Sequence, residues 1–246
     1  TALVGNFLVL PLLVFALVAG LDVFGRALAG SRLEVDALSL GLLLVLLVPC
    51  TDWFLTFVHL ARGDRAAAAV ITPVNLVVQL GMLPLYLALF SSGRTPVLEP
   101  GPVAAAAGVV LLPLLAATLF ERFLRASPQE HLRRERLGRW PIPLLAVVML
   151  FVAVTHVPAA LAAPGVLWIG VLVCVVFLGA AVGLAWILAE IAGLGTAQRA
   201  TLMCTMGTRN SFVVLPVAVA LPAGWELAAA VIVVQGLIEL LGMAGV

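Results

Sequence analysis

The chain consists of long apolar stretches separated by short polar ones. A helix that crosses the ~30 Å hydrocarbon core of a bilayer needs about 20 apolar residues. The apolar stretches reach that length, and they lack the alternation of apolar and polar residues that is typical of strands in a membrane barrel. The pattern predicts about eight membrane-spanning helices, at residues 2–24, 34–58, 66–90, 101–124, 141–157, 164–189, 197–220 and 225–246.

The composition supports an all-α polytopic membrane protein. Hydrophobic residues form 64% of the 246 residues and charged residues only 10%, and the mean hydropathy is +1.24. Such a chain is too apolar for a soluble domain. The net charge of +1 comes from scattered side chains and indicates no nucleic-acid partner. Three cysteines lie inside apolar stretches without CxxC spacing, so we expect no disulfide framework, structural metal or cofactor.

Two polar islands interrupt predicted spans where a membrane helix tolerates them least. The first is Pro49 to Asp52 in the second span, and the second is Gly207 to Ser211 in the seventh. A charge at bilayer depth costs at least ~2.5–3.5 kcal/mol, so such groups usually handle a solute. Broken helices in corresponding positions of two halves point to the binding site of a secondary transporter. The islands therefore predict a transporter with two crossed discontinuous helices.

The spacing of the islands also predicts an inverted repeat. They lie five spans apart, and an odd separation makes the two broken helices cross the membrane in opposite directions. We expect one transmembrane transporter domain over residues 1–246, with a first half at 1–125 and a second half at 126–246. The first half then lacks two helices, which predicts ten helices in the full protein.

The arginines predict the orientation, because all thirteen basic residues are arginine. Nine of them fall on one face of the predicted topology, in the 121–140 loop and at Arg62, Arg65 and Arg199, and three fall on the other face. The positive-inside rule therefore predicts a cytoplasmic 121–140 loop and a cytoplasmic C-terminus in a multi-pass protein of the plasma membrane.

The first island carries candidate substrate contacts. Pro49 cannot donate a backbone hydrogen bond and breaks the helix, and Cys50, Thr51 and Asp52 follow it directly. Irregular backbone at membrane depth survives only when it is buried in protein or lines a cavity. The alternative interpretation is a structural kink with a buried cysteine and a capping aspartate.

The second island brings hydrogen-bond donors and a cation to the same depth. Gly207 weakens the helix, and Arg209, Asn210 and Ser211 follow it. The N-terminus of the following half-helix favours an anion or a polar, oxygen-rich solute. The alternative interpretation is a structural ion pair between Arg209 and Asp52.

Two further spans carry polar side chains on one helical face. Gln235 and Glu239 are spaced i and i+4 in the last span. A buried glutamate can exchange a proton near neutral pH, so Glu239, together with Asp52, is a candidate proton-coupling group. In the third span Thr72, Asn75 and Gln79 follow one face. Asn75 is expected to contact the substrate, and Thr72 and Gln79, together with Gln235, to line the cavity. The alternative is hydrogen bonding between helices.

These motifs resemble the bile acid:sodium symporter superfamily, and within it the Acr-type arsenical-resistance permeases. The resemblance is carried by Pro49–Thr51, Leu60–Asp64, Asn75, Gly207–Asn210 and Gly236–Glu239. It implies a panel domain and a core domain with two discontinuous helices at the binding site. In the arsenite branch, it implies that Cys50 and Glu239 are the functional pair. A thiol is a suitable contact for thiophilic arsenic(III).

The chain departs from both branches at several of these positions. Phe54, Leu55, Thr205 and Arg209 replace polar ligands of the sodium-coupled branch, and Arg209 would repel a cation. Of that set only Thr72 is retained, so we expect the sodium sites to be lost, with Arg209 near one of them. Asp52 and Arg209 are additional charges relative to the arsenite branch.

The sequence therefore predicts sodium-independent, proton-coupled efflux of arsenite or a related small oxyanion. The partners expected are that solute and the lipid bilayer, and the sequence predicts no oligomeric state. An organic-anion transporter of the same superfamily is the first alternative, and a non-transporting sensor or scaffold is the second. No enzyme motif is present in a suitable context, so no catalytic residue is expected.

Overall fold

The computed structural model describes residues 1–28, 31–51, 53–90 and 164–245, together with scattered residues between 108 and 155. Large parts of the predicted spans 101–124 and 141–157 and of the 121–140 loop lie outside these residues. The named elements of the described part are all helical: α1 (Ala2–Val4), the π-helical turn η1 (Gly5–Val9), α2 (Leu10–Leu28), α3 (Arg32–Leu46), α4 (Trp53–Leu60), α5 (Arg65–Phe90), α9 (Pro164–Ile191), α10 (Thr196–Gly207), α11 (Ser211–Val219) and α12 (Glu226–Met243).

Among the described residues, four helical stretches are long and apolar enough to cross a membrane: Ala2–Leu21, Arg65–Phe90, Pro164–Ile191 and Glu226–Met243. They agree closely with four of the predicted spans. The second and seventh predicted spans are each broken into two shorter helices, α3 with α4 and α10 with α11. The chain is therefore a helical, multi-pass membrane protein. The number of eight spans and the inverted repeat stay predictions.

Side chains define where two of these helices begin. Ser31 and Glu34 form a capping box before α3, in which the Ser31 hydroxyl accepts from the Glu34 main-chain N–H and the Glu34 carboxylate accepts from the Ser31 N–H. Asp64 caps α5 by accepting from the N–H of Ala67 at 3.0 Å. The N–H of Asp64 also donates to the carbonyl of Ala197 at 3.1 Å. The α4–α5 and α9–α10 connections therefore lie at the same end of the molecule, with Arg62 in the first connection and Arg65 and Arg199 in the first turns of the helices that follow.

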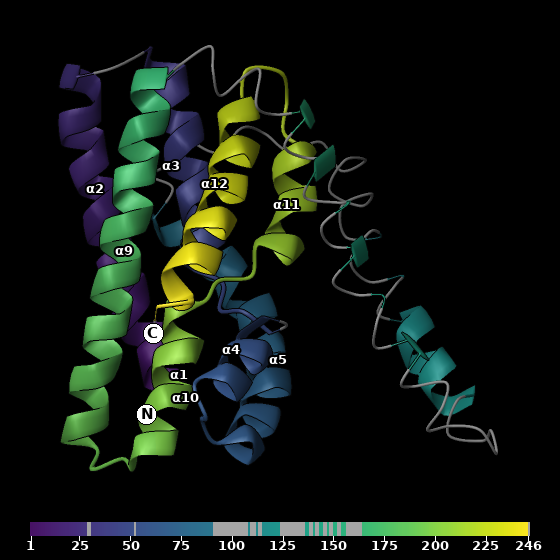
Figure 1. The fold of residues 1–246 in the computed structure, drawn as a ribbon. Coiled ribbons are helices and arrows are strands. Elements are labelled where there is room, and N and C mark those ends of the chain that lie inside the picture. Colours follow the sequence, from purple (N-terminus) through teal and green to yellow (C-terminus); the bar gives the residue numbers. More distant parts are fainter. Residues whose placement is uncertain are drawn as a thin grey trace.

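Helix α12 packs against both α3 and α9; Figure 1 shows the three helices in yellow, blue-purple and green. The contact of α12 with α3 is close because Gly41 faces the backbone of Ala228, where an added Cβ would lie 2.6 Å from the carbonyl oxygen. Small residues at such interfaces let two membrane helices approach closely. This contact fixes the position of α12 along the axis of α3, and with it the positions of Gln235 and Glu239.

The outer faces of α5 and α9 remain apolar and exposed. On α5 they include Val70 and Val77, and on α9 Trp168 and Leu172, each more than 60% exposed. A surface of this kind is unfavourable in water and suits contact with lipid chains. The polar side chains of the spans are directed inward instead.

Candidate functional site

The two helix breaks lie against each other. Pro49 and Arg209 form an antiparallel bridge. Its hydrogen bonds run from the N–H of Cys50 to the carbonyl of Thr208 at 3.2 Å, and from the N–H of Asn210 to the carbonyl of Val48 at 2.9 Å. The two polar islands therefore meet, and we call residues 47–51 and 208–210 the crossing point.

Four helix ends converge at the crossing point. The C-termini of α3 and α10 point toward it, while α4 and α11 begin there. The last carbonyls and first N–H groups of a helix have no partner within the helix, and they carry partial negative and positive charge respectively. The crossing point thus offers oxygen acceptors on one side and N–H donors on the other, inside a protein that excludes water from its apolar parts.

Asn210 joins the two breaks through its side chain. Its amide nitrogen donates to the hydroxyl of Thr51 at 2.9 Å, and its amide oxygen accepts from the N–H of Val213 at 3.2 Å, which caps α11. Cys50, only 2% exposed, lies next to Thr51 in the same unwound segment. The structure therefore brings together Cys50, Thr51 and Asn210, three of the predicted substrate contacts.

A hydrogen-bonded chain connects α12 to the second break. The hydroxyl of Ser211 donates to Gln235 Oε1 at 2.9 Å, and Gln235 Nε2 donates to Glu239 Oε2 at 2.8 Å. The same Glu239 oxygen accepts from the main-chain N–H of Arg209 at 2.7 Å. Gln235 and Glu239 thus share one face of α12, as their spacing indicates, and both face the crossing point.

The guanidinium group of Arg209 is turned toward helix ends. It donates to the carbonyls of Leu46 at 3.4 Å and Thr205 at 3.4 Å, to the carbonyl of Met206, and to Asn6 Oδ1 at 3.2 Å. The side chain is buried, and its charged end lies 5.3 Å from the ring centre of Phe177. The sequence suggested that this cation would serve the solute, whereas in the structure its hydrogen bonds go to the protein.

A second polar cluster lies beside Arg209. Thr205 Oγ1 accepts from Asn6 Nδ2 at 3.0 Å and from Asn75 Nδ2 at 3.3 Å. Gln79, one turn further along α5, is 2% exposed, and neither its amide oxygen nor its amide nitrogen has a partner. Buried amides are nearly always satisfied, so these two atoms are candidates to bind a solute or water. Asn75 and Gln79 are therefore both buried on α5, and their predicted contacts with a solute or its cavity stay predictions.

Two residues of this cluster were not among the residues predicted from sequence. Asn6 belongs to the π-helical turn η1, a rare element that is frequent at functional sites, and Thr205 belongs to the last turn of α10. The available signal was the presence of an asparagine and a threonine in otherwise apolar stretches.

Two predicted residues are placed differently or not at all. The hydroxyl of Thr72 donates to the carbonyl of Ala68 in its own helix at 2.9 Å, so Thr72 does not join the polar cluster by a hydrogen bond. Asp52 lies outside the described residues, and its predicted substrate contact, proton coupling and ion pair with Arg209 stay predictions.

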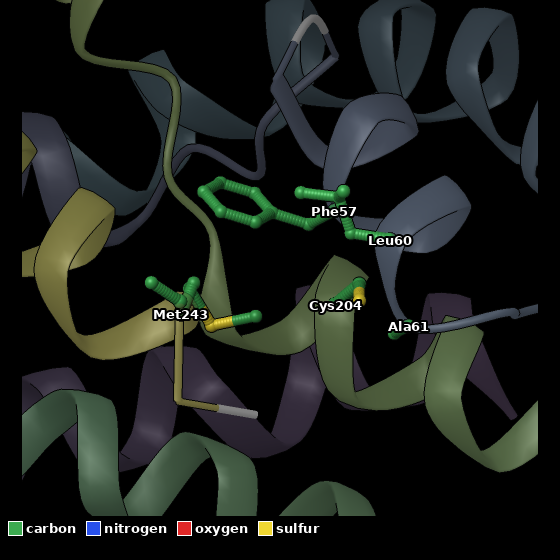
Figure 2. Close-up of a pocket in the computed structure, with 6 residues that line it drawn as sticks. Phe57, Leu60, Ala61, Cys204 and Met243 are labelled. Carbon is green, nitrogen blue, oxygen red and sulfur yellow. The ribbon is translucent and has the colours of Figure 1, made fainter.

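A small cavity of about 140 Å³ lies between the ends of α4, α10 and α12. Figure 2 shows the lining residues labelled there, including the sulfur-bearing side chains of Cys204 and Met243. Since a water molecule occupies about 30 Å³ in the liquid, the cavity has room for a few waters or one small solute. Cys204 therefore borders this cavity, and the sulfur of Met243 lies close to Gly207 at the end of α10.

Comparison with known proteins gives one finding on the family. A search of curated proteins found no match. The family model described as the Sodium Bile acid symporter family matches residues 1–153, which include the first helix break and all of α5. The chain therefore belongs to the sodium bile acid symporter family, a family of membrane transporters.

Proposed function

We propose that the protein is a secondary transporter that exports arsenite or a related small oxyanion, in exchange for protons and without sodium. The observation that carries the proposal is the crossing point, where two broken helices place a thiol, hydroxyls, amides and a carboxylate around one buried location. Such an arrangement is the recurrent binding site of transporters that alternate between two open states.

Cys50 supports the choice of a thiophilic solute. It lies in the unwound segment itself, with its N–H engaged in the bridge to Thr208. Arsenic(III) is soft and prefers sulfur ligands, and hydroxyl and amide groups such as those of Thr51 and Asn210 suit the oxygens of arsenous acid. Arsenous acid is neutral at pH 7, so it does not require the charge of Arg209.

Glu239 is the proposed proton-exchanging group. Its Oε2 atom accepts two hydrogen bonds, from the main-chain N–H of Arg209 and from Gln235. A proton on that oxygen would make it a weaker acceptor for both donors, so protonation would loosen α12 from the second helix break. Proton binding and the position of the unwound turn are thereby coupled. Asp52 is proposed as a second such group.

A small organic anion is the second candidate solute. The family match favours it, because the family is named for symport of an organic anion. The N-termini of α4 and α11, which both begin at the crossing point, are suited to a carboxylate. Arsenite and a small carboxylate are therefore alternative solutes for the crossing point.

The test is transport into inside-out vesicles that contain the protein. Arsenite uptake is measured by mass detection with and without a pH gradient, in sodium and in choline salts, beside a set of small carboxylates. We expect arsenite uptake that depends on the pH gradient and is the same in both salts. Cys50→Ala should reduce it strongly, whereas Cys174→Ala, a buried cysteine on α9, should not.

The other outcomes separate the candidates. Uptake of carboxylates without arsenite would replace the proposed solute by an organic anion. Transport that needs sodium would contradict the proposed coupling. No uptake of either class would favour the sensor or scaffold.

A further inference from the structure

The guanidinium of Arg209 occupies a set of oxygen atoms that resembles a cation site. We call this set the oxygen cage: Oδ1 of Asn6 and the main-chain carbonyls of Leu46, Thr205 and Met206. All four atoms are neutral acceptors. The ring of Phe177 adds the negative face of an aromatic system at 5.3 Å. Every described group of the oxygen cage thus favours a positive charge.

The carbonyls of the oxygen cage need a partner for a local reason. Leu46 is the last residue of α3, and Thr205 and Met206 belong to the last turn of α10. The final carbonyls of a helix have no N–H partner within the helix, and the dipoles of both helices concentrate negative charge there. In broken-helix transporters, such half-helix C-termini and unwound carbonyls bind the coupling sodium ion.

A sodium ion does not fit the oxygen cage while Arg209 is present. The guanidinium already bonds all four oxygens, and it stays charged in any protein environment. Two unit charges about 4 Å apart at a protein-like effective dielectric repel each other enough to weaken cation binding on the order of 10³-fold. The family name implies a sodium ion. The residues of this chain do not fit a sodium ion in the oxygen cage.

We propose that the Arg209 guanidinium is a tethered cation that takes the place of a coupling sodium ion, and that removing it creates a sodium site. Asn6, Leu46, Thr205 and Met206 would then hold sodium in the variant as they hold the guanidinium now. The inference deepens the proposed function, because it names the residue that makes transport independent of sodium. It does not depend on which solute is carried.

The test compares three variants of the full chain with the wild type in detergent. Arg209→Ala empties the oxygen cage, and Arg209→Lys keeps a shorter tethered cation. Arg199→Ala is the matched control, because Arg199 lies in the neighbouring helix α10, is partly exposed and is paired with Glu190 at 2.6 Å. The melting temperature Tm of each is measured in sodium, potassium and choline chloride at equal ionic strength.

The wild type, Arg209→Lys and Arg199→Ala should show the same Tm in all three salts. Arg209→Ala should be destabilised in choline and regain about 3–6 °C in sodium, when sodium is about tenfold above its Kd. A sodium-specific rise of Tm in the wild type would overturn the proposal. The proposal would also be overturned if the Tm of Arg209→Ala were no higher in sodium than in choline, or if this variant failed to fold in both salts.

Because Tm is read without transport, the result separates from that of the proposed function. Sodium rescue of Arg209→Ala together with no arsenite uptake by the wild type would keep the tethered cation and reject arsenite as the solute. Arsenite uptake by the wild type without sodium rescue would do the reverse.

Discussion

Replacing Thr205 with valine removes one buried hydroxyl and nearly keeps the shape of the side chain. In the structure that hydroxyl oxygen accepts from Asn6 Nδ2 at 3.0 Å and from Asn75 Nδ2 at 3.3 Å. Both asparagines are fully buried, so neither amide can turn to water for a new acceptor. In Thr205→Val the amide nitrogens of Asn6 and Asn75 therefore each lose one hydrogen-bond acceptor.

The expected cost follows from those two donors. A buried donor left without an acceptor costs about 1–3 kcal/mol, and the longer bond from Asn75 belongs at the lower end of that range. We therefore expect Thr205→Val to lower the free energy of unfolding by about 2–4 kcal/mol. For a chain of this size that corresponds to a fall in Tm of about 4–16 °C.

The three cysteines provide the assay. Cys50, Cys174 and Cys204 are each at most 2% exposed, so a thiol-reactive fluorescent dye reports their exposure when the protein unfolds on heating. The control is Thr205→Ser, which keeps the hydroxyl and loses one methyl group, a loss of about 1 kcal/mol. A valine variant that melts within about 2 °C of the serine variant would show that the hydroxyl does not hold the two asparagines.

Three further predictions concern other contacts. Gly41→Ala should lower the free energy of unfolding by about 1–3 kcal/mol, because the added methyl would lie 2.6 Å from a main-chain oxygen of α12. Gly81→Ala on α5 should not lower it, because nothing lies within 4 Å of an added Cβ there. Thermal melting checks both variants, and equal stability of the two would contradict the prediction. A small thiol reagent should label Cys204, which borders the cavity, faster than Cys174 in the folded protein, as mass spectrometry would show; equal rates would mean that the cavity is closed to the reagent. Glu239→Gln should fold, since an amide oxygen can still accept, but lose transport driven by a pH gradient in vesicles; unchanged pH dependence would reject Glu239 as the proton-exchanging group.

Local sequence signals were sufficient to predict the helix breaks. Pro49 removes a donor and Gly207 weakens the helix, and the structure interrupts the helices next to both residues. The spacing of Gln235 and Glu239 likewise predicted a shared face, because helical periodicity is local and needs no knowledge of neighbours. The position of α12 against the second break was not predictable from that spacing alone.

Contacts between distant parts of the chain were not predictable in the same way. Asn6 and Thr205 are 199 positions apart and meet only because η1 packs beside the end of α10. The direction of the Arg209 guanidinium depends on which helix carbonyls lack partners nearby, a property of the assembled helices. For this reason the sequence indicated a buried charge but not that its hydrogen bonds run to helix carbonyls, and the contact of Arg209 with a solute stays a prediction.

The antiparallel bridge at the crossing point uses only backbone atoms, those of Val48, Cys50, Thr208 and Asn210. Its geometry therefore does not depend on which side chains project from positions 50, 51, 210 and 211. Substitutions at these positions could change the solute and remove the side-chain contact of Asn210 with Thr51, while the two backbone hydrogen bonds between the broken helices remain. We expect that relatives with other solutes keep the bridge and diverge at these side chains, so that substrate preference evolves separately from the framework that moves.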